Sequence, residues 1–227
     1  MRTIPGEESQ LDSRSMLFQR ILERINRLQF IPSSHCYNLT ISHERKFVWF
    51  RVAKVGTRTI FDHMKDNGVH LDLEHPYRVY YAPRLYGDYF KFAFVRNPWD
   101  RLVSCWHDKV LKINHFKFDD ANLARMKEFG HFVDYVSRLD IENCDIHLRP
   151  QCSLIDLEHI DYLGRLETFT DDLYFVFQQL DIPSAELSHK NKSFRQKDYK
   201  AYYTDELRES VYQIYRKDIQ IFGYKYD

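Results

Sequence analysis

The sequence has neither an excess of one charge nor a long apolar run. It contains 227 residues, of which 33 are basic and 33 are acidic, so the formal net charge is zero. General nucleic-acid-binding domains are usually basic, so this balance argues against a nucleic-acid partner and requires any anion site to be built locally. No stretch approaches the roughly 20 apolar residues of a membrane-spanning helix, and the polar start MRTIPGEESQ lacks a signal-peptide pattern. We therefore expect a cytoplasmic protein with no membrane span, unless an N-terminal anchor has been removed.

Cysteine and glycine are both sparse. The four cysteines form no CxxC pair, and the chain contains no HExxH, so we expect no metal site. Cys144 and Cys152 are close enough along the chain to form a disulfide, but free thiols fit a cytosolic protein better. With seven glycines in the chain, a glycine that separates two elements is expected to have a specific role.

Internal repeats and low-complexity segments are also missing. The chain is 44% hydrophobic and 29% charged, which is ordinary for a soluble globular protein. Its length fits one medium-sized domain. We expect a single domain over residues 1–227, with a flexible tail at residues 1–12 and an amphipathic helix over residues 13–28. The oligomeric state is not readable from the sequence.

What the sequence does contain is a series of strand–loop–helix units. Nearly continuous apolar runs predict strands at residues 47–52, 89–95 and 159–163, as expected for strands buried on both faces. Helical patterns follow them at residues 57–68, 99–111 and 170–180, and a last amphipathic helix is expected at residues 204–222. Such alternation predicts a three-layer α/β domain, with a central parallel sheet flanked by helices and right-handed crossovers.

The first strand–helix turn, Lys54-Val55-Gly56-Thr57-Arg58-Thr59, has the features of an anion-binding loop. Its glycine lets the backbone approach an anion, and the amides that follow open a helix whose positive end faces the same point. The lysine adds a full charge, and the threonine hydroxyls add donors. An ordinary turn with an exposed lysine is an equally open interpretation. The GxxxxGK[ST] loop occurs nowhere, which removes the main support for an ATP- or GTP-hydrolysing enzyme.

The second turn is Arg96-Asn97-Pro98, followed by the helical segment WDRLVS. Arg96 closes a buried strand, where a charge is costly unless it meets a partner of opposite sign. That partner is either a bound anion or a carboxylate such as Asp100. Ser104 lies two helical turns further on, where its hydroxyl can meet the same anion if the helix runs back across the turn.

These two turns resemble the 5′-phosphosulfate loop and the 3′-phosphate motif of sulfotransferases that use 3′-phosphoadenosine 5′-phosphosulfate (PAPS). The KVG loop and RNPWDRLVS are most similar to the carbohydrate branch, sulfotransferase family 2. HLRPQ at residues 147–151, YLGRLE at residues 162–167 and the ending YRKDIQIFGYKY resemble further motifs of that branch, in the same order. The resemblance extends from about residue 47 to residue 224. It implies a P-loop-like fold that moves sulfate from PAPS to a hydroxyl on a carbohydrate or glycolipid, leaving 3′,5′-adenosine bisphosphate.

The resemblance also implies roles for individual residues. Arg96 and Ser104 would hold the 3′-phosphate, while Lys54 would also balance charge on the leaving phosphate. Arg58 and Thr59 differ from the commonest family residues, so their side-chain roles stay open. The basic segment at residues 189–195 either closes over the nucleotide or is a solvated loop. The residues that would hold the 5′-phosphosulfate are Lys54, Val55, Gly56, Thr57, Arg58 and Thr59.

A histidine is the expected base for the acceptor hydroxyl, since its pKa suits neutral pH. Among the 11 histidines, His147 is the first candidate because it lies in the HLRPQ motif, and His75 is the second. A structural role for His147 is equally open. His43, His115 and His131 are expected at the surface.

Two further assignments stay open at this level. Glu167 binds substrate, orients Arg149 or caps the next helix. Several tyrosines either stack on sugar rings or pack in the core: Tyr77, Tyr80, Tyr81, Tyr86 and Tyr89. The competing functions are a P-loop-type small-molecule kinase and a catalytically silent nucleotide-binding domain of the same fold.

Overall fold

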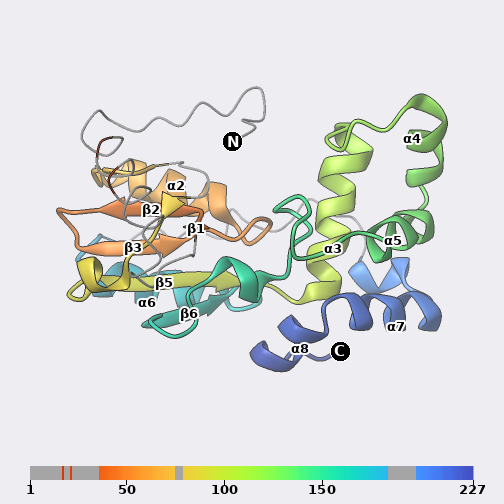
Figure 1. Ribbon diagram of the computed structural model, residues 1–227. Helices are drawn as coiled ribbons and strands as arrows, with labels where there is room; N and C mark the ends of the chain where they lie inside the picture. The colour runs from red at the N-terminus through yellow and green to blue at the C-terminus, as the bar shows by residue number, and fades with distance from the viewer. Residues whose placement is uncertain (1–16, 18–20, 22–35, 75–78, 184–197, 227) are drawn as a thin grey trace.

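The computed structural model describes residues 17, 21, 36–74, 79–183 and 198–226 (Figure 1). Four expectations fall outside these residues: the tail at 1–12, nearly all of the helix at 13–28, the candidate base His75 and the basic segment at 189–195. Tyr77 also falls outside them. Among the described residues, no helix is long and apolar enough to cross a membrane.

A mostly parallel sheet flanked by helices forms the centre of the fold, so the chain has the expected α/β architecture. Its strands lie in the order β2-β3-β5-β6, with β3, β5 and β6 parallel. Their apolar side chains are largely buried, which explains why β3 and β5 read as continuous apolar runs. The bounds are β2 Leu39–Ser42, β3 Phe47–Phe50, β5 Phe90–Val95 and β6 Tyr162–Arg165.

The edge strand β2 departs from the expected parallel sheet, because it pairs antiparallel with β3. The two strands form a hairpin whose turn ends at Lys46, which has a φ of 49°. All four residues of β2 are buried, although its sequence LTIS alternates apolar and polar residues. A separate two-stranded sheet pairs β1 Cys36–Tyr37 with β4 Val79–Tyr80.

Two helices share a hydrophobic core with the sheet. Helix α2, Thr57–Asp66, follows β3 and buries Ile60 and Met64. Helix α6, Phe169–Gln179, follows β6 and buries one side that includes Phe177. Both lie close to their expected positions. A short 3-10 helix, η1 Pro83–Tyr86, precedes β5.

The remaining helices form a second hydrophobic core around Trp99, Phe132 and Val211. Figure 1 shows them on one side of the molecule and the sheet on the other, with β5 leading directly into α3. The helices are α3 Pro98–Trp106, the π-helix η2 His107–Lys112, α4 Asp120–Met126, α5 Phe129–Ser137, α7 Asp205–Ile214 and α8 Arg216–Phe222. The 3-10 helix η3 Gln151–Leu154 contacts α8, and the 3-10 helix η4 Tyr199–Tyr202 contacts α3.

Two expected helices differ from the structure. The helix expected over residues 99–111 changes to π-helical geometry after Trp106. The helix expected over residues 204–222 is two helices, which meet at Tyr215. Tyr215 leaves helical geometry (φ −109°, ψ 25°), and its buried hydroxyl donates to the carbonyl of Leu148.

The third strand also differs, because Gly164 lies inside β6 instead of ending it. Gly164 pairs with Phe94 of β5, and a Cβ at this glycine would lie 2.6 Å from Cε1 of the Phe94 ring. The glycine is therefore a packing requirement within the strand.

Candidate active site

The loop between β3 and α2 has an unusual backbone at two residues. Lys54 has a φ of 74° and Gly56 a φ of 85°, both in the left-handed region. A Cβ at Gly56 would also lie 2.8 Å from Cε2 of Phe169, on α6. Glycine is therefore required at this position both by its backbone conformation and by its close neighbour.

Lys54 is paired and largely buried, so the interpretation of this turn as one with an exposed lysine is wrong. Its Nζ lies 2.8 Å from Oδ2 of Asp108 on η2, and 13% of its side chain is exposed. Burial lowers the pKa of Lys54, although the bond to Asp108 opposes this shift. An anion that enters the loop must therefore compete with Asp108 for the ammonium group.

The other polar groups of the loop have mixed placements. The Thr57 hydroxyl donates to the carbonyl of Val52 at 3.1 Å, which fixes the start of α2. Arg58 is exposed, and Thr59 is half-buried. The first amides of α2 directly follow Gly56, as an anion site at a helix N-terminus requires.

Arg96 adopts the alternative arrangement considered for it, an ion pair with Asp100. Its Nε lies 2.7 Å and its Nη2 2.6 Å from Oδ2 of Asp100, and its Nη1 donates to the carbonyl of Lys54 at 3.1 Å. Only 5% of the residue is exposed. Arg96 thus holds the backbone of the Lys54 loop through this hydrogen bond. Ser104 is half-buried on α3, about one helical turn before Asp108.

Arg101 joins the Lys54 loop to the HLRPQ segment. The sequence motifs assigned it no role. Its Nε donates to the carbonyl of Ala53 at 3.1 Å, its Nη1 to that of Arg149 at 2.9 Å and its Nη2 to that of Ile146 at 3.2 Å. It is 2% exposed. The sequence signal for this role is a charged residue within a helix most of whose residues are buried.

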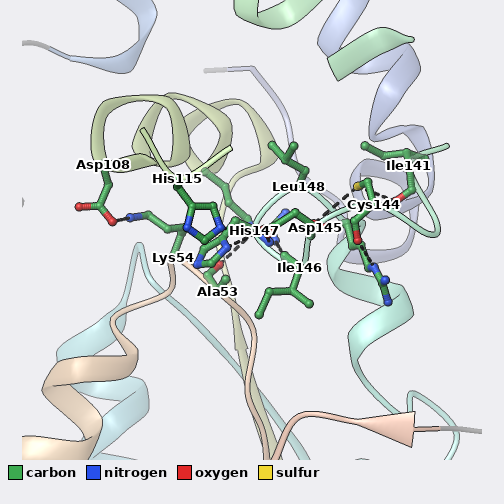
Figure 2. A network of polar contacts seen from close by, with 12 residues as sticks. Ala53, Lys54, Asp108, His115, Ile141, Cys144, Asp145, Ile146, His147 and Leu148 are labelled. Carbon is green, nitrogen blue, oxygen red and sulfur yellow. Dashed lines mark hydrogen bonds and ion pairs between the residues drawn. The ribbon is translucent and has the colours of Figure 1, made fainter. Parts of the chain in front are cut away.

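His147 therefore lies beside the Lys54 loop, where Figure 2 shows it next to a shared carboxylate. Its Nδ1 lies 2.7 Å from Oδ1 of Asp145, and its backbone NH donates to the same oxygen. Burial lowers the pKa of His147, and Asp145 opposes the shift. Burial alone would raise the pKa of Asp145, but its hydrogen bonds with the histidines hold it well below the usual range.

His115 is the second partner of Asp145, and it is partly buried where a surface position was expected. Its Nε2 lies 3.0 Å from Oδ2 of Asp145, and 24% of its side chain is exposed. The rings of His115 and His147 are 5.0 Å apart. Thirty residues separate His115 from Asp145, and no motif links them in the sequence.

The other matched motifs hold the site together. Gln151 is fully buried and exchanges two hydrogen bonds with the backbone of Arg96. Buried Asp218 on α8 accepts from the backbone of Gln151. Glu167 accepts from the amide of Asn97 and from the Tyr224 hydroxyl. Arg149 donates to the carbonyl of Cys144, so Glu167 does not orient it.

The tyrosines proposed to stack on sugars are largely core residues. Tyr81 is 1% and Tyr86 6% exposed, and their rings stack at 5.7 Å. Tyr80 and Tyr89 are half-buried. All four cysteines are described and free. Cys144 and Cys152, both among the described residues, therefore form no disulfide.

The chain is similar to known sulfotransferases. Residues 37–225 match the sulfotransferase family. Carbohydrate sulfotransferase 8 of Mus musculus is 27% identical over 169 residues, which cover 60% of this chain and 40% of that protein. The chain thus aligns with less than half of that relative's length. No solved structure matches it.

Proposed function

The chain belongs to the sulfotransferase family, and from this membership we propose that it moves the sulfuryl group of PAPS to a hydroxyl of a carbohydrate or glycolipid. The observation that carries the proposal is the arrangement around Arg101, which holds the Lys54 loop against the segment that contains His147. A cation for the leaving phosphate and a base for the acceptor are thus neighbours. The carbohydrate acceptor is supported by the name of the mouse relative and by the motifs of that branch.

The Lys54 loop fits the phosphosulfate end of PAPS, which would supply the sulfuryl group. Lys54 and the first amides of α2, which directly follow Gly56, would bind the 5′-phosphosulfate. Arg96 and Ser104 would bind the 3′-phosphate, with Arg96 shared between that group and Asp100.

Asp145 prepares His147 to accept a proton. An ionised carboxylate only accepts hydrogen bonds, so His147 donates through Nδ1 and keeps its lone pair on Nε2. In the transfer, the acceptor oxygen forms a bond to sulfur while the bond from sulfur to the phosphate oxygen breaks. His147 takes the acceptor proton, and Lys54 balances the charge that develops on the phosphate.

Ligand binding is the first test. We expect 3′,5′-adenosine bisphosphate to raise the melting temperature of the chain, and ATP with Mg²⁺ to have a smaller effect. Stabilisation by ATP with Mg²⁺ alone would favour the kinase and contradict the proposal. No response to either nucleotide would contradict the proposal, whereas a response to 3′,5′-adenosine bisphosphate without any transfer would favour the catalytically silent domain.

The transfer itself is tested with labelled PAPS against a panel of glycans and glycolipids. We expect His147→Ala to reduce transfer by about 10²-fold or more, because general bases contribute about that much. Its affinity for 3′,5′-adenosine bisphosphate should stay close to that of the wild type. The matched control is His131→Ala, since His131 is a partly exposed histidine that pairs with Glu128. Equal transfer by both variants would exclude His147 as the base.

A further inference from the structure

The side chains of His115, Asp145 and His147 are also arranged as metal ligands could be. Each residue offers one ligand atom, and these atoms all lie within 4.8 Å of one another. We propose that the three side chains form a binding site for one divalent transition-metal ion of the zinc class. A metal site is not expected from the sequence, because the three ligands follow no recognised spacing.

The imidazole rings of His115 and His147 both face the carboxylate of Asp145. In Figure 2 the two rings lie on the same side of Asp145, close to Lys54. Oδ1 of Asp145 lies 2.7 Å from Nδ1 of His147, and Oδ2 lies 3.0 Å from Nε2 of His115. A single ion between these atoms would replace the two shared protons, as metals do when they bind histidine.

The ligand set suits zinc. Two histidines and one carboxylate with a fourth, open position are a known zinc arrangement, with metal–ligand distances of about 2.0–2.2 Å. Tetrahedral ligands at these distances are separated by roughly 3.3 Å. The two nitrogen–oxygen pairs, at 2.7 and 3.0 Å, must therefore lengthen slightly, and the three ligand atoms, which lie within 4.8 Å of one another, must draw together around one ion.

The backbone holds two of the ligands in place before any metal arrives. The carbonyl of Asp145 accepts from the amides of Leu148 and Arg149, at 2.9 and 3.1 Å. Arg101 fixes the carbonyl of Ile146 between Asp145 and His147. The three side chains are between 17% and 24% exposed, so an ion can reach them in a partly dry site.

Neighbouring groups limit the affinity and the ligand number. The Cys144 thiol is directed at the carbonyls of Ile141 and Asp145, so the cluster has no sulfur ligand. Lys109 acts on His147 as a like charge. This repulsion weakens cation binding at the cluster.

Metal binding would also stop the proposed transfer, a consequence that rests on the proposed function. A metal on Nδ1 of His147 leaves the ring proton on Nε2, where the base needs a lone pair. Zinc would therefore inhibit transfer by occupying the base, without blocking the Lys54 loop.

The test is metal binding to the untagged full chain after treatment with a chelator. We expect Zn²⁺ to bind with one equivalent in isothermal titration, and Co²⁺ to give visible d–d absorption bands that Zn²⁺ removes. His115→Ala should lower the affinity at least tenfold, about 1.4 kcal/mol, and Asp145→Asn should also weaken it. His131→Ala is the control and should bind as the wild type does.

Far-UV circular dichroism and the melting temperature of each variant check that it is folded, independently of nucleotide binding. Absence of metal binding by the wild type, or equal binding by folded His115→Ala, overturns the metal site. Metal binding that depends on His115, in a chain that ignores the nucleotide, supports the metal site and contradicts the sulfotransferase proposal. The two proposals therefore fail separately.

Discussion

The two cations expected to bind PAPS already hold carboxylates within the protein. Lys54 pairs with Asp108, and Arg96 pairs with Asp100. Both pairs are largely buried, where an unpaired charge is costly. A polyanionic ligand must therefore displace these carboxylates from Lys54 and Arg96. Neutralising one of the carboxylates should consequently change the affinity for the ligand.

We expect Asp108→Asn to bind 3′,5′-adenosine bisphosphate more tightly than the wild type, by about threefold to tenfold. The substitution removes a negative charge near the bound phosphates and frees Lys54 from its ion pair. Isothermal titration measures the change. Asp134→Asn is the control, because Asp134 pairs with Arg138 on an exposed surface. Weaker binding by Asp108→Asn would mean that Asp108 positions Lys54 for the ligand.

Arg96 tests the other end of the nucleotide. If it binds the 3′-phosphate, Arg96→Ala should weaken binding of 3′,5′-adenosine bisphosphate at least tenfold, about 1.4 kcal/mol. Binding of adenosine 5′-monophosphate, which lacks the 3′-phosphate, should change much less. Equal losses for both nucleotides would instead indicate that Arg96 acts by supporting the Lys54 loop through its bond to the Lys54 carbonyl.

Single residues also show where sequence reasoning reached its limit. Lys54, Gly56 and Arg96 were found because each interrupts or closes an apolar run. His115 was not found, because its partner Asp145 comes from a segment that approaches it only in the folded chain. The pairing of Arg96 with Asp100 was one of two open interpretations, since burial requires a counter-charge without specifying which.

At the scale of elements, local patterns predicted the parts that local physics controls. β3, β5, α2 and α6 follow from continuous apolar runs and helical spacing. The parts that differ depend on distant partners. Tyr215 interrupts the C-terminal helix while bonded to Leu148, and Gly164 continues a strand because Phe94 occupies its side-chain space.

The turn between β3 and α2 depends on Gly56. We expect Gly56→Ala to lower the free energy of unfolding by about 1–3 kcal/mol, because alanine there has an unfavourable positive φ and meets Phe169. It should also weaken nucleotide binding. Urea denaturation and isothermal titration measure the two effects.

Gly130→Ala is the matched control for that substitution. Gly130 lies in α5, and a Cβ there would meet only Leu207, at the ordinary distance of 3.8 Å. We expect this variant to be more stable by about 0.5–1 kcal/mol, since alanine is the better helix former. If both variants had equal stability, the proposed strain at Gly56 would be absent.

At the scale of the whole molecule, the site lies where the two hydrophobic cores meet. The sheet core supplies the Lys54 loop, and the helical core supplies Arg101 and the π-helix that carries Asp108. Hydrogen bonds across this junction join residues far apart in sequence, such as Asn97 and Lys225. Motif order in the sequence predicted that these segments belong to one site, but not which side chains join them.

A substitution at Arg101 tests how strongly the two segments at this junction are held together. Three backbone carbonyls from two segments accept its hydrogen bonds. Lysine keeps the charge but lacks the planar fork of donors, so Arg101→Lys should leave at least one carbonyl without a partner. We expect the free energy of unfolding to fall by about 1.5–3 kcal/mol, as for a lost hydrogen bond to a charged group.

Amide exchange separates this local effect from general destabilisation. In Arg101→Lys, we expect faster exchange at residues 145–149 than in the strands of the sheet, because the segment that carries His147 loses its attachment to the Lys54 loop. The control is Arg138→Lys, in an exposed ion pair worth at most about 1 kcal/mol. Uniformly faster exchange in Arg101→Lys would mean that Arg101 stabilises the whole fold without specifically positioning His147.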